Sequence, residues 1–222
     1  EGLFAAETVT AYEVGFKSAP NPRYSYSLAT FYLDYNNPQA RIFVSFDLPG
    51  GGTITSNSLS NLDEAESYGF EAEFSLRPTD ALTLNGSLTL NETEIQQTSN
   101  IGGNAALFDG NPLPFAPDTS LTLGGSYAFD VTDTISALAS VHGKYRSEYF
   151  LDAEGLAARS QDGFATLQAA LDLGFEGTDV TLSVWGRNLT DEDYAVSGYG
   201  FIGYNTFRSE PRTFGASLEY VF

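Results

Sequence analysis

The stretch "YGFEAEFSLRPTDALTLNGSLTLN" (68–91) contains two segments in which hydrophobicity alternates from residue to residue. The apolar positions of its first segment are Tyr68, Phe70, Ala72, Phe74 and Leu76. A period of two places these side chains on one face of a β-strand, and the small and charged residues between them on the other. Because the connection "RPTDA" (77–81) has room only for a tight turn, the stretch predicts an antiparallel hairpin.

The same alternation continues along the rest of the chain. Seven further segments show it, at 12–17, 24–35, 121–129, 135–146, 167–175, 180–188 and 213–222. One face of each is rich in apolar and aromatic residues, whereas the other is mostly small or hydroxylic and carries few lysines. A soluble sandwich would instead cover its polar face with Lys and Glu and bury large side chains between two sheets. Lipid outside and a polar interior, with about 10 residues per crossing, would produce this pattern, which predicts an all-β, antiparallel transmembrane β-barrel.

The connections between these segments are of two lengths. Short ones lie at 77–81, 130–133 and 176–179, and long ones lie at 47–60, 98–120, 151–163 and 197–211. Short turns at one rim and long loops at the other are typical of outer-membrane barrels. Aromatic residues also concentrate near strand ends, where they would form two interfacial girdles. Those beside short turns are Tyr127, Phe129, Phe175, Tyr220 and Phe222, and those beside a long loop are Tyr145, Tyr149 and Phe150.

Composition excludes several kinds of protein. The 222 residues contain 10 Lys and Arg against 29 Asp and Glu, a formal net charge of −19, whereas a nucleic-acid-binding face needs basic residues. Cysteine is absent, which excludes disulfides and thiolate metal sites, and the single histidine has no second His or Cys to complete a transition-metal site. No nucleophile–base pair, phosphate loop or pocket-like pair of carboxylates indicates an enzyme or a bound cofactor.

The extent of the chain and its number of strands stay open. The first residues, "EGLFAAETVT" (1–10), lack a basic and an apolar signal region, which predicts a removed targeting segment or a longer protein. In "YNNPQARIFVSFD" (35–47), a turn at "NNP" gives ten strands, an even number that could close alone. A bulge at Pro38 in one strand over 24–46 gives nine strands, which would be part of a larger barrel.

Several segments, in order along the chain, resemble the C-terminal part of TonB-dependent outer-membrane receptors. They are "ETVTAYEVGFKS" (7–18), "ATFYLDYNNPQ" (29–39), "AESYGFEAEFSLRPTDALTLNGSLTLNETEI" (65–95), "WGRNLTDEDY" (185–194) and "PRTFGASLEYVF" (211–222). The resemblance implies a barrel of about 22 strands closed by an N-terminal plug. Residues 1–222 would supply its last nine strands, with the plug and the earlier strands absent. It also implies a multi-pass location in the bacterial outer membrane and TonB-powered uptake of a scarce nutrient, with a ferric siderophore or similar metal chelate as the favoured ligand.

The resemblance also implies the partners. They are outer-membrane lipid, lipopolysaccharide, the remaining barrel and plug segments, and the TonB complex acting through the plug. The acidic runs "DEAE" (63–66) and "DEDY" (191–194) would lie at a solvated rim, where divalent cations could bridge acidic groups to lipopolysaccharide. Two alternatives stay open: a self-contained small outer-membrane barrel with a structural or adhesion role, and a soluble all-β binding domain.

A first group of candidate ligand contacts is basic. His142, Lys144 and Arg146 share the polar face of one predicted strand. They could form a lumenal track for an anionic chelate or for carboxylates of the plug. The alternative is that they form ion pairs with carboxylates of other strands, namely Glu71, Glu73 or Asp172.

A second group is aromatic. Tyr199, Phe201 and Tyr204 lie in "SGYGFIGYNTF" (197–207), and they could stack on a planar ligand or pack against neighbouring loops. At the C-terminus, Tyr220 and Phe222 resemble the signal by which outer-membrane barrels are recognised for insertion. No metal site is predicted.

Overall fold

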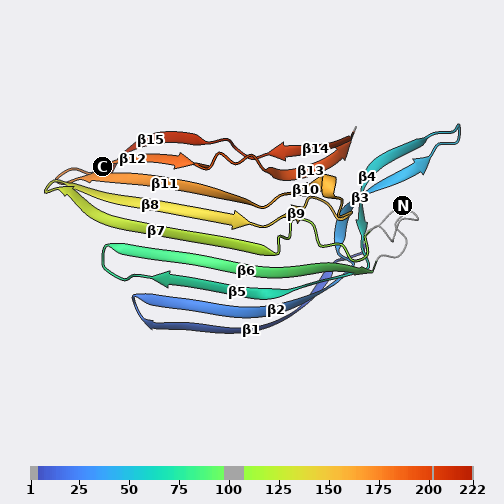
Figure 1. Cartoon of the computed structure of the whole chain (residues 1–222), viewed down its shortest axis with the longest axis horizontal. Coiled ribbons are helices and arrows are strands. Elements are labelled where there is room, and N and C mark those ends of the chain that lie inside the picture. The colour runs from blue at the N-terminus through green and yellow to red at the C-terminus, as the bar shows by residue number, and fades with distance from the viewer. Residues whose placement is uncertain (1–4, 98–107, 202, 222) are drawn as a thin grey trace.

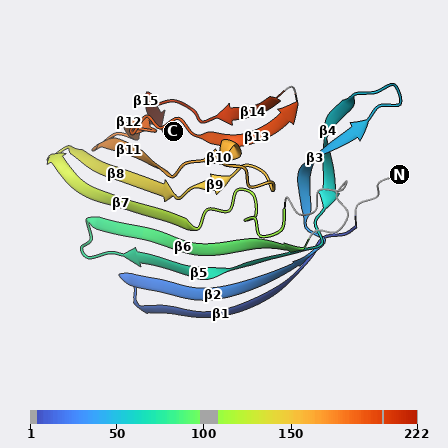
Figure 2. The same cartoon turned by 45° about the vertical axis from the view of Figure 1, so that its right-hand side comes forward.

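One curved antiparallel sheet forms most of the molecule (Figure 1). The computed structural model describes residues 5–97, 108–201 and 203–221. Within these ranges the main sheet has nine strands, which follow one another in chain order. They are β1 (Thr8–Asn21), β2 (Tyr24–Asn36), β5 (Glu64–Leu76), β6 (Leu82–Gln97), β7 (Thr119–Thr132), β8 (Ile135–Arg146), β11 (Phe164–Phe175), β12 (Val180–Arg187) and β15 (Thr213–Tyr220). Strands β1 and β15 form the two edges, as Figure 2 also shows.

The register gives this sheet one apolar and one polar face, because residues opposite each other on paired strands share a face. Apolar pairs include Phe70↔Leu90, Leu171↔Val184 and Leu182↔Leu218. Polar pairs include Glu71↔Thr89, Thr122↔Lys144 and Asp172↔Ser183. The apolar face is open in this chain, with Phe214 and Leu218 each 71% exposed. The prediction of an all-β, antiparallel fold is confirmed.

Glycines interrupt the alternation where an aromatic ring of the neighbouring strand covers the backbone. A Cβ atom at Gly86 would lie 2.5 Å from Cε1 of Phe74, and one at Gly215 would overlap the indole of Trp185. Only glycine leaves room for these rings. Each ring therefore fills the space over bare backbone and packs two adjacent strands together.

The connections at the two ends of the sheet differ. Short turns join β1 to β2, β5 to β6, β7 to β8 and β11 to β12 at one end. At the other end, the long connections contain three small sheets (Figure 1): β3 (Gln39–Asp47) with β4 (Thr53–Asn61), β9 (Tyr149–Phe150) with β10 (Ser160–Gln161), and β13 (Ala195–Phe201) with β14 (Gly203–Arg208). The predicted long loops are thus partly hairpins.

Helical structure is scarce in the described part of the chain. A 3₁₀ turn, η2, covers Ala157–Arg159, and no described helix is long and apolar enough to cross a membrane.

The segment 24–46 follows neither of the two predicted alternatives. Strand β2 ends at Asn36, and Asn37 has a left-handed backbone with φ of 54°. The next residues do not rejoin the main sheet; they form β3, which pairs only with β4 among the described strands. Asparagine tolerates this conformation, and Pro38 has no N–H to continue the ladder. The side chain of Asn61 secures the break by donating to the carbonyl oxygen of Asn37 at 2.6 Å.

Two small apolar cores pack the long connections onto the end of the sheet. The first consists of Ala40, Ile42, Leu62, Ala65, Ile95, Phe108 and Ala153. The second consists of Tyr149, Leu151, Phe164 and Ala195. The prediction that Tyr149 belongs to an interfacial girdle is therefore wrong. Its side chain is 4% exposed, and its hydroxyl donates to the carbonyl oxygen of Ala195 at 2.9 Å, because the 188–212 connection folds over it.

Candidate functional site

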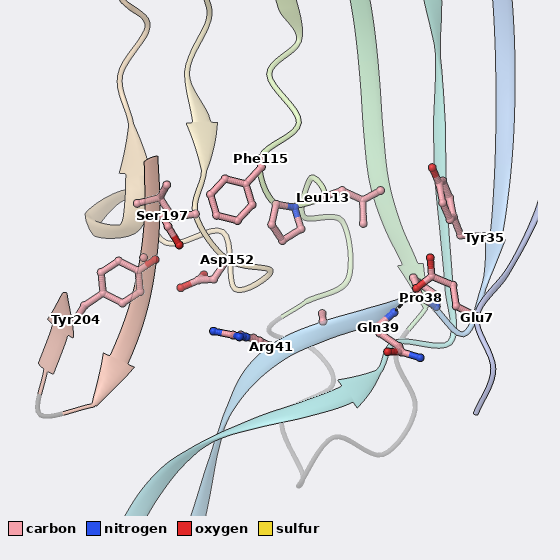
Figure 3. A pocket seen from close by; sticks show the side chains of 14 residues that line it. Glu7, Tyr35, Pro38, Gln39, Arg41, Leu113, Phe115, Asp152, Ser197 and Tyr204 are labelled. Atoms are coloured by element: carbon pink, nitrogen blue, oxygen red, sulfur yellow. Dashed lines mark hydrogen bonds between the residues drawn. The ribbon is translucent and has the colours of Figure 1, made fainter. Parts of the chain in front are cut away.

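A pocket of about 480 Å³ lies among the long connections (Figure 3). One wall is the start of β3, and the other walls come from the segments 113–115, 151–152 and 197–204. Its lining side chains include Glu7, Tyr35, Gln39, Arg41, Leu113, Phe115, Asp152 and Tyr204. The pocket thus combines residues that are more than 190 positions apart in the chain, and the two apolar cores hold these segments together.

Arg41 points towards the pocket because of the alternation along β3. Its neighbours Ala40 and Ile42 are 7% and 1% exposed and belong to the first core. The side chain between them must therefore lie on the opposite side of the strand. At the start of β3, the backbone N–H of Gln39 donates to the Glu7 carboxylate at 2.8 Å. This carboxylate therefore already has a hydrogen-bond donor.

Phe115 is the most unusual residue of the lining. Its φ is 59°, a left-handed conformation that is rare for a bulky residue and marks strain. Its backbone N–H donates to the carbonyl oxygen of Phe150 at 2.8 Å, and its ring centroid lies 6.2 Å from that of Tyr149. The ring nevertheless stays 45% exposed. The surroundings therefore hold an aromatic face open in the pocket.

A compact ionic cluster adjoins the pocket at Asp152. Nη1 of Arg159 donates to Asp152 at 3.0 Å and to Glu154 at 2.7 Å, and all three side chains are mostly buried. The guanidinium also lies 5.1 Å from the ring centroid of Tyr204, within the range of a cation–π contact. Burial raises the pKa of Tyr204 to about 12, and the charge of Asp152 adds to this shift. The phenol is therefore neutral at physiological pH.

The charged side chains of the pocket differ in whether they have a partner within the protein. Asp152 is paired with Arg159, and Glu7 accepts from Gln39. Across residues 5–97, 108–201 and 203–221, the ion pairs found do not include Arg41. Among the residues that the structure describes, the pocket therefore offers one cation without a carboxylate partner, Arg41, beside exposed aromatic and aliphatic surface.

The predicted aromatic loop contributes to this pocket in part. Tyr204 lines it, together with Ser197 and Gly198. Tyr199 and Phe201 pair through their backbones with Asn205 and Gly203, and their side chains lie outside the described residues.

The predicted basic track lies apart from the pocket, on the polar face of β8. His142, Lys144 and Arg146 stand opposite Gln168, Thr166 and Phe164 of β11. In the described part of the sheet, no ion pair links them to Glu71, Glu73 or Asp172. The His142 ring instead lies over Gly124, where a Cβ atom would come within 2.5 Å of Nδ1. The structure thus brings the three basic residues together on one strand, and none of them forms an ion pair with a described carboxylate.

The structure describes one of the two residues of the predicted insertion signal. Tyr220 ends β15, opposite Val180 at the short-turn end of the sheet, and its side chain is 61% exposed. Phe222 lies outside the described residues.

Sequence reasoning missed three residues that line the pocket, Arg41, Phe115 and Asp152, and also Arg159, which pairs with Asp152. Two weak signals were present. Arg41 is the only charged residue in the mostly apolar run "ARIFVSF" (40–46), and Phe115 follows a proline in "PLPF" (112–115).

Comparisons with known proteins agree on one family. The sequence profile described as "TonB dependent receptor-like, beta-barrel" matches residues 2–189. The iron-regulated outer membrane virulence protein of Vibrio cholerae is 27% identical over 183 residues, which cover 79% of this chain and 26% of that protein. The chain thus spans about a quarter of the length of the curated relatives that it matches.

Solved structures show the same fold. The ferric yersiniabactin uptake receptor FyuA of Yersinia pestis superposes with a TM-score of 0.76 at 22% identity, covering 97% of this chain and 30% of that one. The ferric preacinetobactin receptor BauA of Acinetobacter baumannii has a TM-score of 0.68 at 18% identity, covering 95% and 29%. These proteins are receptors rather than enzymes. Since the family profile covers most of its residues, the chain belongs to the TonB-dependent receptor family, as part of a β-barrel of the bacterial outer membrane.

Proposed function

We propose that this chain is the C-terminal wall of a receptor barrel that captures a ferric siderophore or a similar metal chelate for TonB-powered import. The family supports uptake across the outer membrane. The named ligands of two similar structures, ferric yersiniabactin and ferric preacinetobactin, support an iron chelate.

The observation that carries the proposal is the pocket at the long-connection end of the sheet. It is large enough for a small molecule, and it combines aromatic surface with Arg41, a cation that forms no ion pair with any described residue. Recognition sites for small ligands have this composition, a mostly apolar wall with a few polar groups that orient the ligand. A wall with only a structural or adhesive role does not require a concave site of this kind.

The two edges of the sheet support the placement within a larger barrel. β1 and β15 each pair on one side only among the described strands. Unpaired backbone in a membrane is costly, so both edges need further strands. We therefore place residues 1–222 at the C-terminal end of a barrel whose remaining strands and plug lie elsewhere in the protein.

Each surface then has a partner. The apolar face would contact lipid, and the polar face would contact water and the plug. Acidic residues at the outer rim would meet lipopolysaccharide through divalent cations. The pocket would hold the ligand above the plug, and TonB would act on the plug to open the path.

Uptake by iron-starved cells tests this proposal. Cells with and without the gene are given radioiron-labelled ferric siderophores of several chemical classes. We expect uptake of at least one chelate to fall to background when either the gene or TonB is removed. Unchanged uptake of every chelate in the gene deletion, with the protein present in the outer membrane of the parent cells, would overturn the proposal and favour a structural or adhesive role.

A further inference from the structure

We propose that a basic patch on the polar face of the sheet holds an acidic surface of the protein's own plug. The basic patch consists of His142, Lys144 and Arg146 on β8 and Arg187 on β12. The inference rests on the proposed function, which places residues 1–222 in a plugged barrel, and it adds the residues and the charge of one contact between the two parts.

The strand register brings these basic residues together inside the sheet. β8 lies between β7 and β11, away from both edges (Figure 1). His142, Lys144 and Arg146 occupy every second position of β8, so they share its polar face at spacings of about 6.5–7 Å.

Arg187 extends the basic patch by two strands. Gln168 of β11 stands opposite His142 of β8. Because β11 and β12 are paired through Ala169↔Gly186, Arg187 comes to lie beside Gln168 on the same face. The four basic residues therefore belong to three neighbouring strands.

The charges of the basic patch have no acidic partner among the described residues. Across 5–97, 108–201 and 203–221, the ion pairs found include none of its members. The residues opposite Lys144 are the neutral Thr122 of β7 and Thr166 of β11. The guanidinium of Arg187 lies 4.8 Å from the ring centroid of Trp185, which is also neutral. Since like charges at these spacings repel each other, the patch carries an unbalanced positive charge.

The acidic residues of the same face lie some distance away. The only acidic residue of β11, Asp172, is four positions beyond Gln168, about 13 Å along the strand. Glu71 and Glu73 are on β5, three strand spacings from β8, or about 14 Å. The chain contains 29 acidic residues against 10 Lys and Arg, so this separation departs from its overall composition. The charge of the polar face is therefore locally opposite to that of the chain.

The length of chain outside these residues supplies the occupant. Residues 1–222 match only about a quarter of the iron-regulated relative, so most of a protein of that length lies elsewhere. The polar face of a closed barrel surrounds its interior, and whatever fills the interior contacts this face. Fixed cations in a confined space require a fixed counter-charge, because unpaired charges away from bulk water are costly. A passing anionic ligand would supply that charge only briefly, whereas carboxylates of the plug would supply it permanently.

Carbodiimide cross-linking of the intact protein in outer membranes tests the inference. The reagent joins an amine to a carboxylate without a spacer, so it reports only groups in contact. Residues 1–222 contain two lysines, Lys17 and Lys144, so the products are few. We expect mass spectrometry to find Lys144 joined to an Asp or Glu of the plug. Lys144→Arg keeps the charge but cannot react, and it should abolish this product alone.

Hydrogen exchange measures what the contact contributes. Lys144→Gln with Arg146→Gln should speed the exchange of the plug amides around the cross-linked carboxylate about tenfold, the effect of one or two partly screened ion pairs. Arg23→Gln with Arg208→Gln removes the same charge from side chains that already pair with Asp80 and Asp193. This control should leave exchange in the plug unchanged. Exchanging the charges of Lys144 and the cross-linked plug carboxylate should restore the wild-type rate.

Three outcomes would overturn the inference. One is a cross-link from Lys144 only to carboxylates within residues 1–222, such as Asp172. Another is no cross-link from Lys144 while other lysines of the protein react. The third is exchange in the plug within twofold of the wild type for Lys144→Gln with Arg146→Gln; slower uptake of an anionic chelate by that variant would then assign the patch to the passing ligand. The cross-link needs no ligand, so its presence without gene-dependent uptake would refute the import function alone.

Discussion

Replacing Arg159 should release the outer hairpin β13–β14 from the rest of the molecule. One guanidinium nitrogen of Arg159 serves both Asp152 and Glu154, at 3.0 and 2.7 Å. The side chains are 20%, 9% and 12% exposed, so water screens the cluster poorly. Arg159→Gln leaves two adjacent carboxylates without a cation. Breaking a buried pair in this way costs about 3–5 kcal/mol, which corresponds to at least about a hundredfold change in a local opening equilibrium.

Hydrogen exchange of the intact protein in detergent measures this change. Two amides report on this change: one lies within the 151–163 connection that holds the ionic cluster, and the other joins β13 to that connection. The N–H of Leu151 donates to the carbonyl oxygen of Arg159 at 2.8 Å, and the N–H of Ala195 donates to Oε1 of Gln161 at 2.7 Å. In Arg159→Gln, peptides containing these amides should lose about two powers of ten in protection. The strands of the main sheet should exchange as in the wild type.

Two controls make the reasoning refutable. Arg208 forms an ion pair with Asp193 within the 188–212 connection, which contains the hairpin, but these side chains are 45% and 73% exposed. Arg208→Gln should therefore cost at most about 1 kcal/mol. Neutralising Asp152 and Glu154 as well, in a triple variant, should restore most of the protection. Equal losses in Arg159→Gln and Arg208→Gln, or no recovery in the triple variant, would show that the cluster is not what holds the hairpin.

Three further predictions concern other parts of the chain. Burial raises the pKa of Tyr204 to about 12, whereas an unfolded tyrosine ionises near 10. Docking of the hairpin should therefore weaken as the pH rises from about 10 to about 12. In Tyr204→Phe, protection factors corrected for base-catalysed intrinsic exchange should not fall over this range, and a fall equal to that of the wild type would contradict this. Gly215→Leu should collide with the indole of Trp185 and lower the amount of folded barrel seen by electrophoretic mobility, whereas Gly215→Ser should have a smaller effect because its side chain is shorter. Deletion of Phe222 should reduce outer-membrane levels, and levels equal to the wild type would count against its role as an insertion signal.

The sheet was predictable because its physical cause is local. Hydrophobicity alternates with a period of two within each strand, so each strand has an apolar and a polar face before it pairs. When neighbouring strands pair, residues of one kind come to lie on the same face, as in Leu182↔Leu218 and Asp172↔Ser183. The break after Asn36 was visible at Pro38, but the sequence did not show where the chain goes next. Pairing of β3 with β4 rather than with the main sheet depends on contacts with residues such as Asn61.

The pocket was not predictable for a related reason. Arg41, Phe115 and Asp152 lie in three connections, and none carries a motif of its own. Their proximity depends on two cores assembled from distant segments. Tyr149 shows the same limit: its position beside a long loop suggested a membrane interface, and only the fold of 188–212 over it buries the ring. The role of His142, Lys144 and Arg146 remains a prediction.

Accessibility of single cysteines tests the central claim, a sheet with lipid on one face and the barrel interior on the other. Residues 1–222 contain no cysteine, so each label introduced here reports one position once any cysteine elsewhere in the intact protein has been replaced. Spin labels are placed at Val141 and Leu167 on the apolar face, and at Ser140 and Gln168 on the polar face, in the intact protein in lipid bilayers. The account predicts preferential collision with oxygen, which partitions into lipid, at Val141 and Leu167 but not at Ser140 and Gln168. Equal accessibility of all four labels to a water-soluble nickel chelate would contradict it.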